Sequence, residues 1–189
     1  MNGVEIQEVL DSMVILCDTR EQPTKRAARR YERFGCPFRR ATLSYGDYAC
    51  QAKLPNGELI NDDSVTVNPV CVVERKSGLD ELIQNFCQGR DRFKREFERA
   101  AEHGARIYLL VEGASWIKVQ TGSYRSRMKP KALMASIIAY MVRYNMNLIF
   151  CDEESSGKLI KEILYRDLKE RLERGDFDGN ATKEGGKHE

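Results

Sequence analysis

The sequence predicts an α/β fold of three layers, in which helices flank a central mixed β-sheet. Short apolar runs that are typical of buried strands alternate along the 189 residues with longer segments of helical spacing. The segment from Asp47 to Val70 indicates a β-meander, and it contains the hairpin turn signal Pro55-Asn56-Gly57. Because meander strands run antiparallel, the sheet is not purely parallel. The length suits one domain with its own core.

The first elements predicted are a lead-in, a strand and a helix. Residues 1–12 are expected to be a short lead-in. The apolar run 13–17 is expected to be a strand, and it ends at the charged sequence Asp18-Thr19-Arg20-Glu21. A helix is expected over 25–34. It is strongly basic, which suits either a solvated surface or contacts to phosphates.

Two strands are expected next, over 38–43 and 49–54. In the turn between them, Gly46 can adopt a backbone angle that other residues avoid. Residues 58–68 are polar, and we expect a loop or a short edge strand there.

The central strand is predicted at Val70–Val73, a continuous apolar run that is typical of a strand buried on both faces. It leads directly into Glu74, Arg75 and Lys76. Because side chains alternate along an extended chain, Glu74 and Lys76 point to one side and Arg75 to the other. A carboxylate and an ammonium at one strand end suit a divalent cation held beside a phosphate.

Two helices and another buried strand follow the central strand. Residues 79–87 and 90–103 have apolar side chains at helical spacing, with a break at Gln88-Gly89. The strand is expected over 106–111, and Glu112 closes it.

Residues 115–130 differ from the rest of the chain. From Lys118 to Lys131 there are five basic residues and no acidic ones. The segment is either a solvated mobile loop or an arm that binds a nucleic-acid backbone, and both can hold at once.

The last elements predicted are a helix over 131–145, a strand over 147–151 and a helix over 155–172 that a serine at 155 or 156 caps. The first of these helices is apolar around more than one stripe. It packs either in the core alone or also against a second subunit. Residues 174–189 are rich in glycine and charge, so we expect a disordered tail.

Composition narrows the classes of function. The net charge is only +2, so nucleic-acid binding has to be argued from where the charges lie. The six cysteines suit small buried residues in a reducing compartment. With neither a membrane-length apolar stretch nor a signal peptide, we expect an intracellular, cytoplasmic protein, nucleoid-associated if prokaryotic or phage. His103 and His188 are the two histidines, which nearly excludes zinc sites and histidine general bases.

The chemistry is therefore expected from carboxylates, a lysine and a hard metal. The acidic residues that end or flank predicted strands are Asp18, Glu21, Asp47 and Glu74. Carboxylates that converge at strand ends repel one another unless a divalent cation holds them. Mg²⁺ fits because it favours oxygen ligands and retains several waters. Taken alone, an Asp followed by Glu-x-Lys is a weak signal that more often marks an ordinary ion pair.

Several ordered motifs together resemble a known family, the XPF-type structure-specific endonucleases of the PD-(D/E)xK, or restriction-endonuclease-like, superfamily. The motifs are Asp18-Thr19-Arg20-Glu21, Gly46-Asp47-Tyr48, Glu74-Arg75-Lys76 with Asp80, Gly89-Arg90 and Leu110-Val111-Glu112. The resemblance covers about residues 14–152. It implies a nuclease domain over 13–173 with a restriction-endonuclease-like fold.

The resemblance also implies roles for individual residues. Asp47 and Glu74 would be metal ligands for Mg²⁺ or Mn²⁺, with the Arg75 carbonyl as a third and Asp18 completing or supporting the site. Lys76 would position the attacking water or stabilise developing negative charge. The supporting residues would be Arg20, Glu21, Arg75 and Asp80. Asp80 has the alternative role of capping the helix that follows it.

The partners implied are branched or nicked duplex DNA and a second copy of the chain, paired through 131–145 and 147–151. The DNA-binding candidates are Arg90, Lys118, Arg125, Arg127, Lys129 and Lys131. Such proteins usually carry a helix-hairpin-helix domain after the nuclease and often a helicase-like region before it, and from this sequence we expect neither, because the segment after Leu172 is too short for the former. The resemblance therefore supports nuclease chemistry better than a preference for flaps or forks.

Two other functions are weighed against a metal-dependent DNA endonuclease. One is a catalytically inactive DNA-binding or scaffold subunit, which need not keep Asp47, Glu74 and Lys76. The other is a small-molecule phosphohydrolase, which would not need the basic segment from Lys118 to Lys131.

Overall fold

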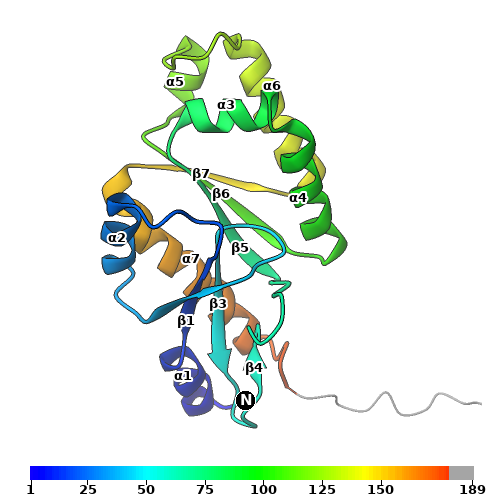
Figure 1. The fold of residues 1–189 in the computed structure, drawn as a ribbon. Coiled ribbons are helices and arrows are strands. Elements are labelled where there is room, and N and C mark those ends of the chain that lie inside the picture. The colour runs from blue at the N-terminus through cyan, green and yellow to red at the C-terminus, as the bar shows by residue number, and fades with distance from the viewer. Residues whose placement is uncertain (179–189) are drawn as a thin grey trace, which may run out of the picture.

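The central sheet has seven strands in a computed structural model that describes residues 1–178 (Figure 1). The strands are β1 (Val14–Asp18), β2 (Phe38–Ala41), β3 (Tyr48–Lys53), β4 (Leu59–Ile60), β5 (Cys71–Lys76), β6 (Arg106–Glu112) and β7 (Asn147–Cys151). Their order is β2-β1-β3-β5-β6-β7, and β4 pairs with β3 at one end. The short β4 agrees with the edge strand that was one of the two expectations for residues 58–68.

The sheet is mixed, as the sequence predicts. Strand β3 runs antiparallel to both β1 and β5, whereas β5, β6 and β7 are parallel to one another. As a result, the carboxyl ends of β1, β5 and β6 lie at the same edge as the beginning of β3. The charged residues that follow the apolar runs therefore meet at this edge.

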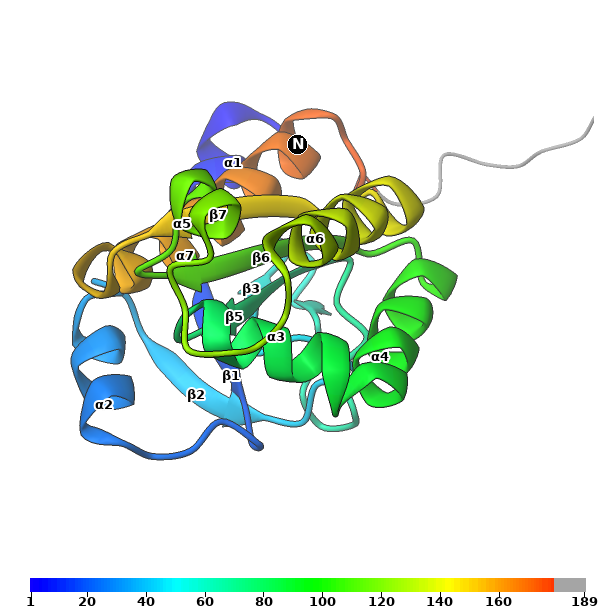
Figure 2. The ribbon, with the colours of Figure 1, turned by 90° about the horizontal axis from the view of Figure 1, so that it is seen from above.

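Helices cover both faces of the sheet (Figure 2). They are α1 (Gly3–Asp11), α2 (Lys25–Glu32), α3 (Leu79–Cys87), α4 (Arg90–Glu102), α5 (Trp116–Thr121), α6 (Pro130–Tyr144) and α7 (Glu153–Glu173). One core cluster joins α1 and α7 to β1 and β3. A second joins α3, α4 and α6 to the other face of β5 and β6. This arrangement confirms the three-layer α/β fold.

Three local expectations are wrong. Residues 1–12 contain helix α1, which begins with a capping box between Asn2 and Glu5. The segment 115–130 contains the short helix α5, which Ser115 caps. Helix α7 is capped by Asp152, whose side chain accepts from the Ser155 N–H, and not by either serine.

The structure describes only the first five residues of the segment 174–189 that we expected to be a disordered tail. Residues 174–178 form turns, and the Phe177 ring lies 4.5 Å from the Arg171 guanidinium. The carboxylate of Asp178 is 2.7 Å from the amino group of Met1, so this turn is joined to the start of α1. Residues 179–189 lie outside the described residues. None of the helices in residues 1–178 is long and apolar enough to cross a membrane.

Candidate active site

Asp47 lies between the ends of β1 and β5. Its carbonyl accepts from the Asp18 N–H at 2.8 Å, and its own N–H donates to the Val73 carbonyl at 2.9 Å. The backbone pairing of β3 with its two neighbours therefore fixes where the Asp47 side chain begins. This brings together Asp47 and Glu74, which the sequence separates by a loop and a hairpin.

The turn before Asp47 requires a glycine. Gly46 has φ = +72°, and a Cβ built on it would lie 2.0 Å from Cγ2 of Val72, a residue buried in β5. Both the backbone angle and the lack of space exclude a side chain. The close approach of this turn to β5 is what places Asp47 beside Glu74.

The two carboxylates have unequal surroundings. One oxygen of Asp47, Oδ2, accepts from the Arg75 N–H at 2.7 Å. Glu74 Oε1 accepts from Lys76 Nζ at 2.6 Å, but Glu74 Oε2 is buried and has no hydrogen-bond donor in the described part of the chain. A buried carboxylate oxygen without a donor is costly, which suggests that a ligand is required there.

The pKa values of both acids are raised. Burial, followed by the charges of Glu74 and Glu21, raises the pKa of Asp47 well above its usual range. Burial raises the pKa of Glu74 to about 7, and the nearby Lys76 opposes this shift. An additional positive charge would stabilise the ionised form of both groups.

Lys76 is held on the same side of β5 as Glu74. Its side chain is 8% exposed, and Nζ lies 3.9 Å from Glu81 Oε1 and 5.2 Å from the centre of the Phe93 ring. Burial by itself would lower the pKa of Lys76, but the Glu74 and Asp47 carboxylates outweigh it and raise the pKa. Lys76 is therefore a fixed ammonium group next to the two acids.

These groups line a cavity of about 350 Å³ at the edge of the sheet. Its lining residues come from the strand ends and from helices α3 and α4. They are Arg20, Glu21, Asp47, Glu74, Arg75, Lys76, Glu81, Arg92 and Glu96. Five of these side chains are carboxylates and four are cations.

The residues fit a divalent cation of the Mg²⁺ type. Within residues 1–178, no three side chains of His, Cys, Asp or Glu are grouped to hold a metal by themselves. Asp47 and Glu74 form a pair of hard oxygen donors, and the unpartnered Glu74 Oε2 is available. A cation held by one or two carboxylates that keeps several waters is the usual Mg²⁺ arrangement.

Arg75 makes its contacts on the other face of β5. Its Nη1 lies 3.4 Å from Glu112 Oε2 and its Nη2 3.8 Å from Glu21 Oε1. Glu112 is almost fully buried and also contacts Arg26 and Arg30 of α2. Arg30 is thus paired inside the protein and the exposed Arg26 is paired at its edge, so this helix is not simply a free surface for phosphate.

Asp18 is not part of the cavity wall. Its carboxylate accepts from the N–H and Nε of Arg20 and from the Leu43 N–H, at 2.6–2.9 Å. The side chain is only 1% exposed. Asp18 therefore holds Arg20 and the chain at Leu43 in place, and a role as a metal ligand remains a prediction.

Asp80 also lies outside the cavity, and it does not cap α3, whose N-cap is Gly78. Its carboxylate accepts from the Arg125 N–H, from Arg125 Nε and from the Ser126 N–H, at 2.9–3.1 Å. Asp80 thus connects α3 to the basic segment.

The predicted DNA-binding residues are all exposed, but they do not gather in the cavity. Arg90 faces α6, where it lines a different hollow with Met128 and Arg143. Lys118 Nζ donates to the Gly113 carbonyl at 2.6 Å. The other four predicted DNA-binding residues lie on the segment that Asp80 contacts: Arg125, Arg127, Lys129 and Lys131.

Sequence reasoning missed three residues of the cavity: Glu81, Arg92 and Glu96. Glu81 accepts from the N–H and hydroxyl of Ser77, and Glu96 Oε1 accepts from the Gly46 N–H at 3.0 Å. All three belong to helices rather than strand ends. The only sequence signal for Glu96 is its place directly before the buried Phe97.

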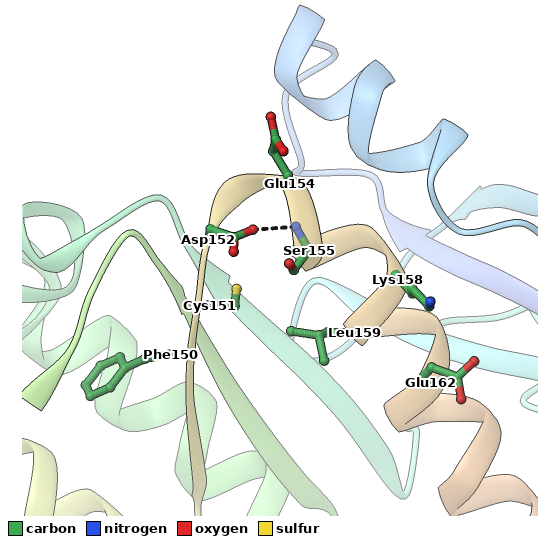
Figure 3. Close-up of a pocket in the computed structure, with 8 residues that line it drawn as sticks. All are labelled: Phe150, Cys151, Asp152, Glu154, Ser155, Lys158, Leu159 and Glu162. Carbon is green, nitrogen blue, oxygen red and sulfur yellow. Dashed lines mark hydrogen bonds between the residues drawn. The ribbon is translucent and has the colours of Figure 1, made fainter.

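A larger hollow, of about 610 Å³, lies between the end of β7 and α7 (Figure 3). Its lining combines Phe150, Cys151 and Leu159 with charged side chains that point in different directions. The Asp152 carboxylate there is used to cap α7. The other acids of this hollow and Lys158 are exposed or half-buried, unlike the buried Glu74 and Lys76 of the smaller cavity.

The mixed sheet and its flanking helices define a three-layer α/β domain with a buried acid and lysine set at one edge of the sheet. The family model described as the ERCC4 domain matches residues 17–163, and the chain belongs to this family. Among curated protein sequences, none matches it.

Solved structures of XPF from Aeropyrum pernix have the same fold. One has a TM-score of 0.57 at 19% identity, covering 87% of this chain and 69% of that chain. The other, described as a complex with DNA, has a TM-score of 0.56 at 22% identity, covering 84% of this chain and 66% of that chain.

Proposed function

We propose that this protein is a Mg²⁺- or Mn²⁺-dependent DNA endonuclease that hydrolyses phosphodiester bonds. The observation that carries the proposal is the meeting of Asp47, Glu74 and Lys76 in one cavity, with one oxygen of Glu74 lacking a donor among residues 1–178. Membership of the ERCC4 domain family supports the same conclusion. An inactive scaffold subunit would have no need to bury two carboxylates and an ammonium group beside one another.

Each residue has a distinct part in this reaction. Asp47 and Glu74 would hold the metal ion, with the Arg75 carbonyl as a further oxygen ligand. The metal, when bound, would supply an acidified water and neutralise charge on the phosphate. The Lys76 ammonium would donate a hydrogen bond to the oxygen on which negative charge develops. Arg75 and Glu21 would keep β5 and the chain after β1 in register.

DNA is the substrate that the charge distribution supports best. Exposed basic residues lie on the segment from Lys118 to Lys131, where a long polyanion can reach them and a small phosphate ester has no use for them. A structural relative has been solved in complex with DNA. By the sequence resemblance, the preferred substrates are branched, flap, fork or nicked duplexes, and the active form is a homodimer.

One assay separates this proposal from its alternatives. The protein is incubated with Mg²⁺ or Mn²⁺ and labelled flap, fork, nicked and linear duplexes, beside Asp47→Ala and Glu74→Ala. We expect metal-dependent cutting that both variants lose while they still bind DNA. Binding without cutting by the wild-type protein would instead indicate a scaffold subunit, and neither binding nor cutting would indicate a different substrate.

Lys76→Ala tests the role of the ammonium group in the same assay. We expect it to retain Mn²⁺ binding but to cut slower by roughly two to three orders of magnitude, as when a preorganised donor to a transition-state oxygen is removed. A variant that cuts at the wild-type rate would show that the role assigned to Lys76 is wrong.

A further inference from the structure

Four cations line the cavity, and three of them are paired with carboxylates of the protein itself. Arg20 Nε lies 2.6 Å from Asp18, Lys76 Nζ lies 2.6 Å from Glu74, and Arg75 lies between Glu112 and Glu21. Their charges are largely used to hold the fold together, so they offer little net attraction to an incoming phosphate.

Arg92 is the exception among the cavity cations of residues 1–178. It belongs to the first turns of α4, its side chain is exposed, and its guanidinium makes no ion pair or hydrogen bond with the described residues. Glu96 is the residue that would pair with it, because side chains four apart on a helix are neighbours. The Glu96 carboxylate is instead directed at the Gly46 N–H and lies 3.8 Å from Arg20.

Arg90 and Arg92 face different surroundings although they are two residues apart. Two residues of an α-helix correspond to a rotation of about 200°, so the two side chains leave α4 in nearly opposite directions. Arg90 lines the hollow against α6 with Phe86, Ala132 and Arg143, and it does not line the active-site cavity. The Gly89-Arg90 motif of the sequence indicates Arg90 as the arginine at the cavity, whereas the geometry of α4 places Arg92 there.

We propose that Arg92, and not Arg90, is the arginine of α4 that binds a phosphate of the DNA at the cavity. The inference rests on the proposed nuclease function and adds a substrate-binding residue to it. A guanidinium is suited to the task because its planar fork can donate two hydrogen bonds to one phosphate. It also supplies positive charge at a mouth where five carboxylates would otherwise repel the backbone of the DNA.

The test compares Arg92→Ala with the matched variant Arg90→Ala, which removes the same side chain from the same helix. Fluorescence anisotropy measures the affinity of each protein for a labelled nicked duplex in EDTA, where cutting is prevented. We expect Arg92→Ala to weaken binding about tenfold and Arg90→Ala by less than about twofold. Arg92→Lys should fall between wild type and Arg92→Ala, because it keeps the charge but loses the fork.

The salt dependence provides a second measurement. Loss of one phosphate contact should lower the slope of log affinity against log salt by about 1 in Arg92→Ala and leave it unchanged in Arg90→Ala. Equal effects of the two alanine variants, or no effect of Arg92→Ala, would overturn the inference about Arg92 and leave the proposed nuclease function standing. Wild-type protein that binds no DNA at low salt would overturn both the inference and the DNA assignment. Matching thermal melts exclude unfolding as the cause of any loss.

Discussion

Glu96 shows how one side chain from a helix can position a residue on a strand. Its carboxylate accepts from the N–H of Gly46, the residue that turns the chain into Asp47. The turn is already restricted by its left-handed backbone and by its contact with Val72. The additional acceptor satisfies an N–H that has no partner in the sheet, and it connects α4 to the edge where Asp47 and Glu74 meet.

For Glu96, we predict that its hydrogen bond to the Gly46 N–H contributes more to the rate of DNA cutting than its negative charge does. Glu96→Ala should lower the rate of DNA cutting about tenfold or more, because losing a hydrogen bond to a charged group costs roughly 1.5–3 kcal/mol. Glu96→Gln keeps an acceptor oxygen and should restore most of the rate. Single-turnover cutting measures the effect, and hydrogen exchange at the Gly46 amide should be faster in Glu96→Ala only.

The control for Glu96 is Glu98→Ala on the same helix, where the side chain pairs with Lys94 at 3.3 Å near the surface. It should cut at close to the wild-type rate. If Glu96→Gln were as impaired as Glu96→Ala, the negative charge itself would be required and the positioning role would be incorrect.

The sequence reveals some residues of the candidate site and hides others for a physical reason. Glu74 and Lys76 end the apolar strand β5 and Asp47 directly precedes β3, so their position at the sheet edge can be predicted from local pattern. Glu81, Arg92 and Glu96 reach the cavity only because α3 and α4 pack against the sheet at a particular rotation. That rotation is set by contacts between distant segments, which no local pattern contains.

At the scale of elements, one acidic side chain joins the basic segment to α3. Asp80, in the first turn of α3, receives two backbone N–H groups and the guanidinium of Arg125. Desolvation is the largest single influence and by itself would raise the pKa of Asp80, but the hydrogen bonds from Arg125 and Ser126 together with the Arg125 charge outweigh it and lower the pKa. The anchor is therefore ionised and intact at neutral pH.

We predict that Asp80→Ala releases this segment without unfolding the protein. Trypsin should then cut after Arg125 and Arg127 roughly tenfold faster, since local opening no longer breaks these hydrogen bonds. Limited proteolysis with mass spectrometry measures the rates. Asp91→Ala is the matched control, because Asp91 is exposed in the first turn of α4 and has no side-chain partner in the described residues. Equal cutting of the two variants would mean that Asp80 does not anchor the segment.

The helices that sequence reasoning missed, α1 and α5, are those whose sequence patterns span only a few residues. Helix α5 has only six residues, too few for an apolar stripe to be recognised. Helix α1 had a usable signal, the Asn2 and Glu5 capping box, followed by the buried Val9 and Leu10. Near the start of a chain such a pattern is easily interpreted as a loose lead-in. The longer helices α4, α6 and α7 were predicted because each shows several turns of apolar spacing.

At the scale of the whole molecule, the reversed direction of β3 brings the site together. Had β3 run parallel to β5, Asp47 would lie at the opposite edge of the sheet from Glu74. The meander between the two strands was visible in the sequence, so the mixed sheet and the edge where the acids meet could both be predicted. Whether the outer edge of the last strand, β7, is left open or packs against another part of the chain could not be predicted in the same way.

That last strand, β7, forms an open edge of the sheet next to α6. Its side chains from Leu148 to Cys151 are only half-buried, and α6 exposes Ile138 and Val142 at 45% and 80%. An apolar edge strand without protecting charges is prone to pair with another chain. This surface is the one through which the sequence predicts that two copies of the chain associate.

We therefore expect the protein to sediment as a dimer at micromolar concentration and Val142→Glu combined with Ile138→Glu to sediment as a monomer. A charge placed in an apolar interface must be desolvated without a partner, which opposes association. Val4→Glu is the control, since Val4 is 70% exposed on α1 and far along the chain from this surface. Analytical ultracentrifugation distinguishes the outcomes. A wild-type protein that stays monomeric, or a double variant that remains dimeric, would show that α6 and β7 are not the interface. Comparing DNA cutting by the two variants would then reveal whether one copy of the cavity is sufficient for activity.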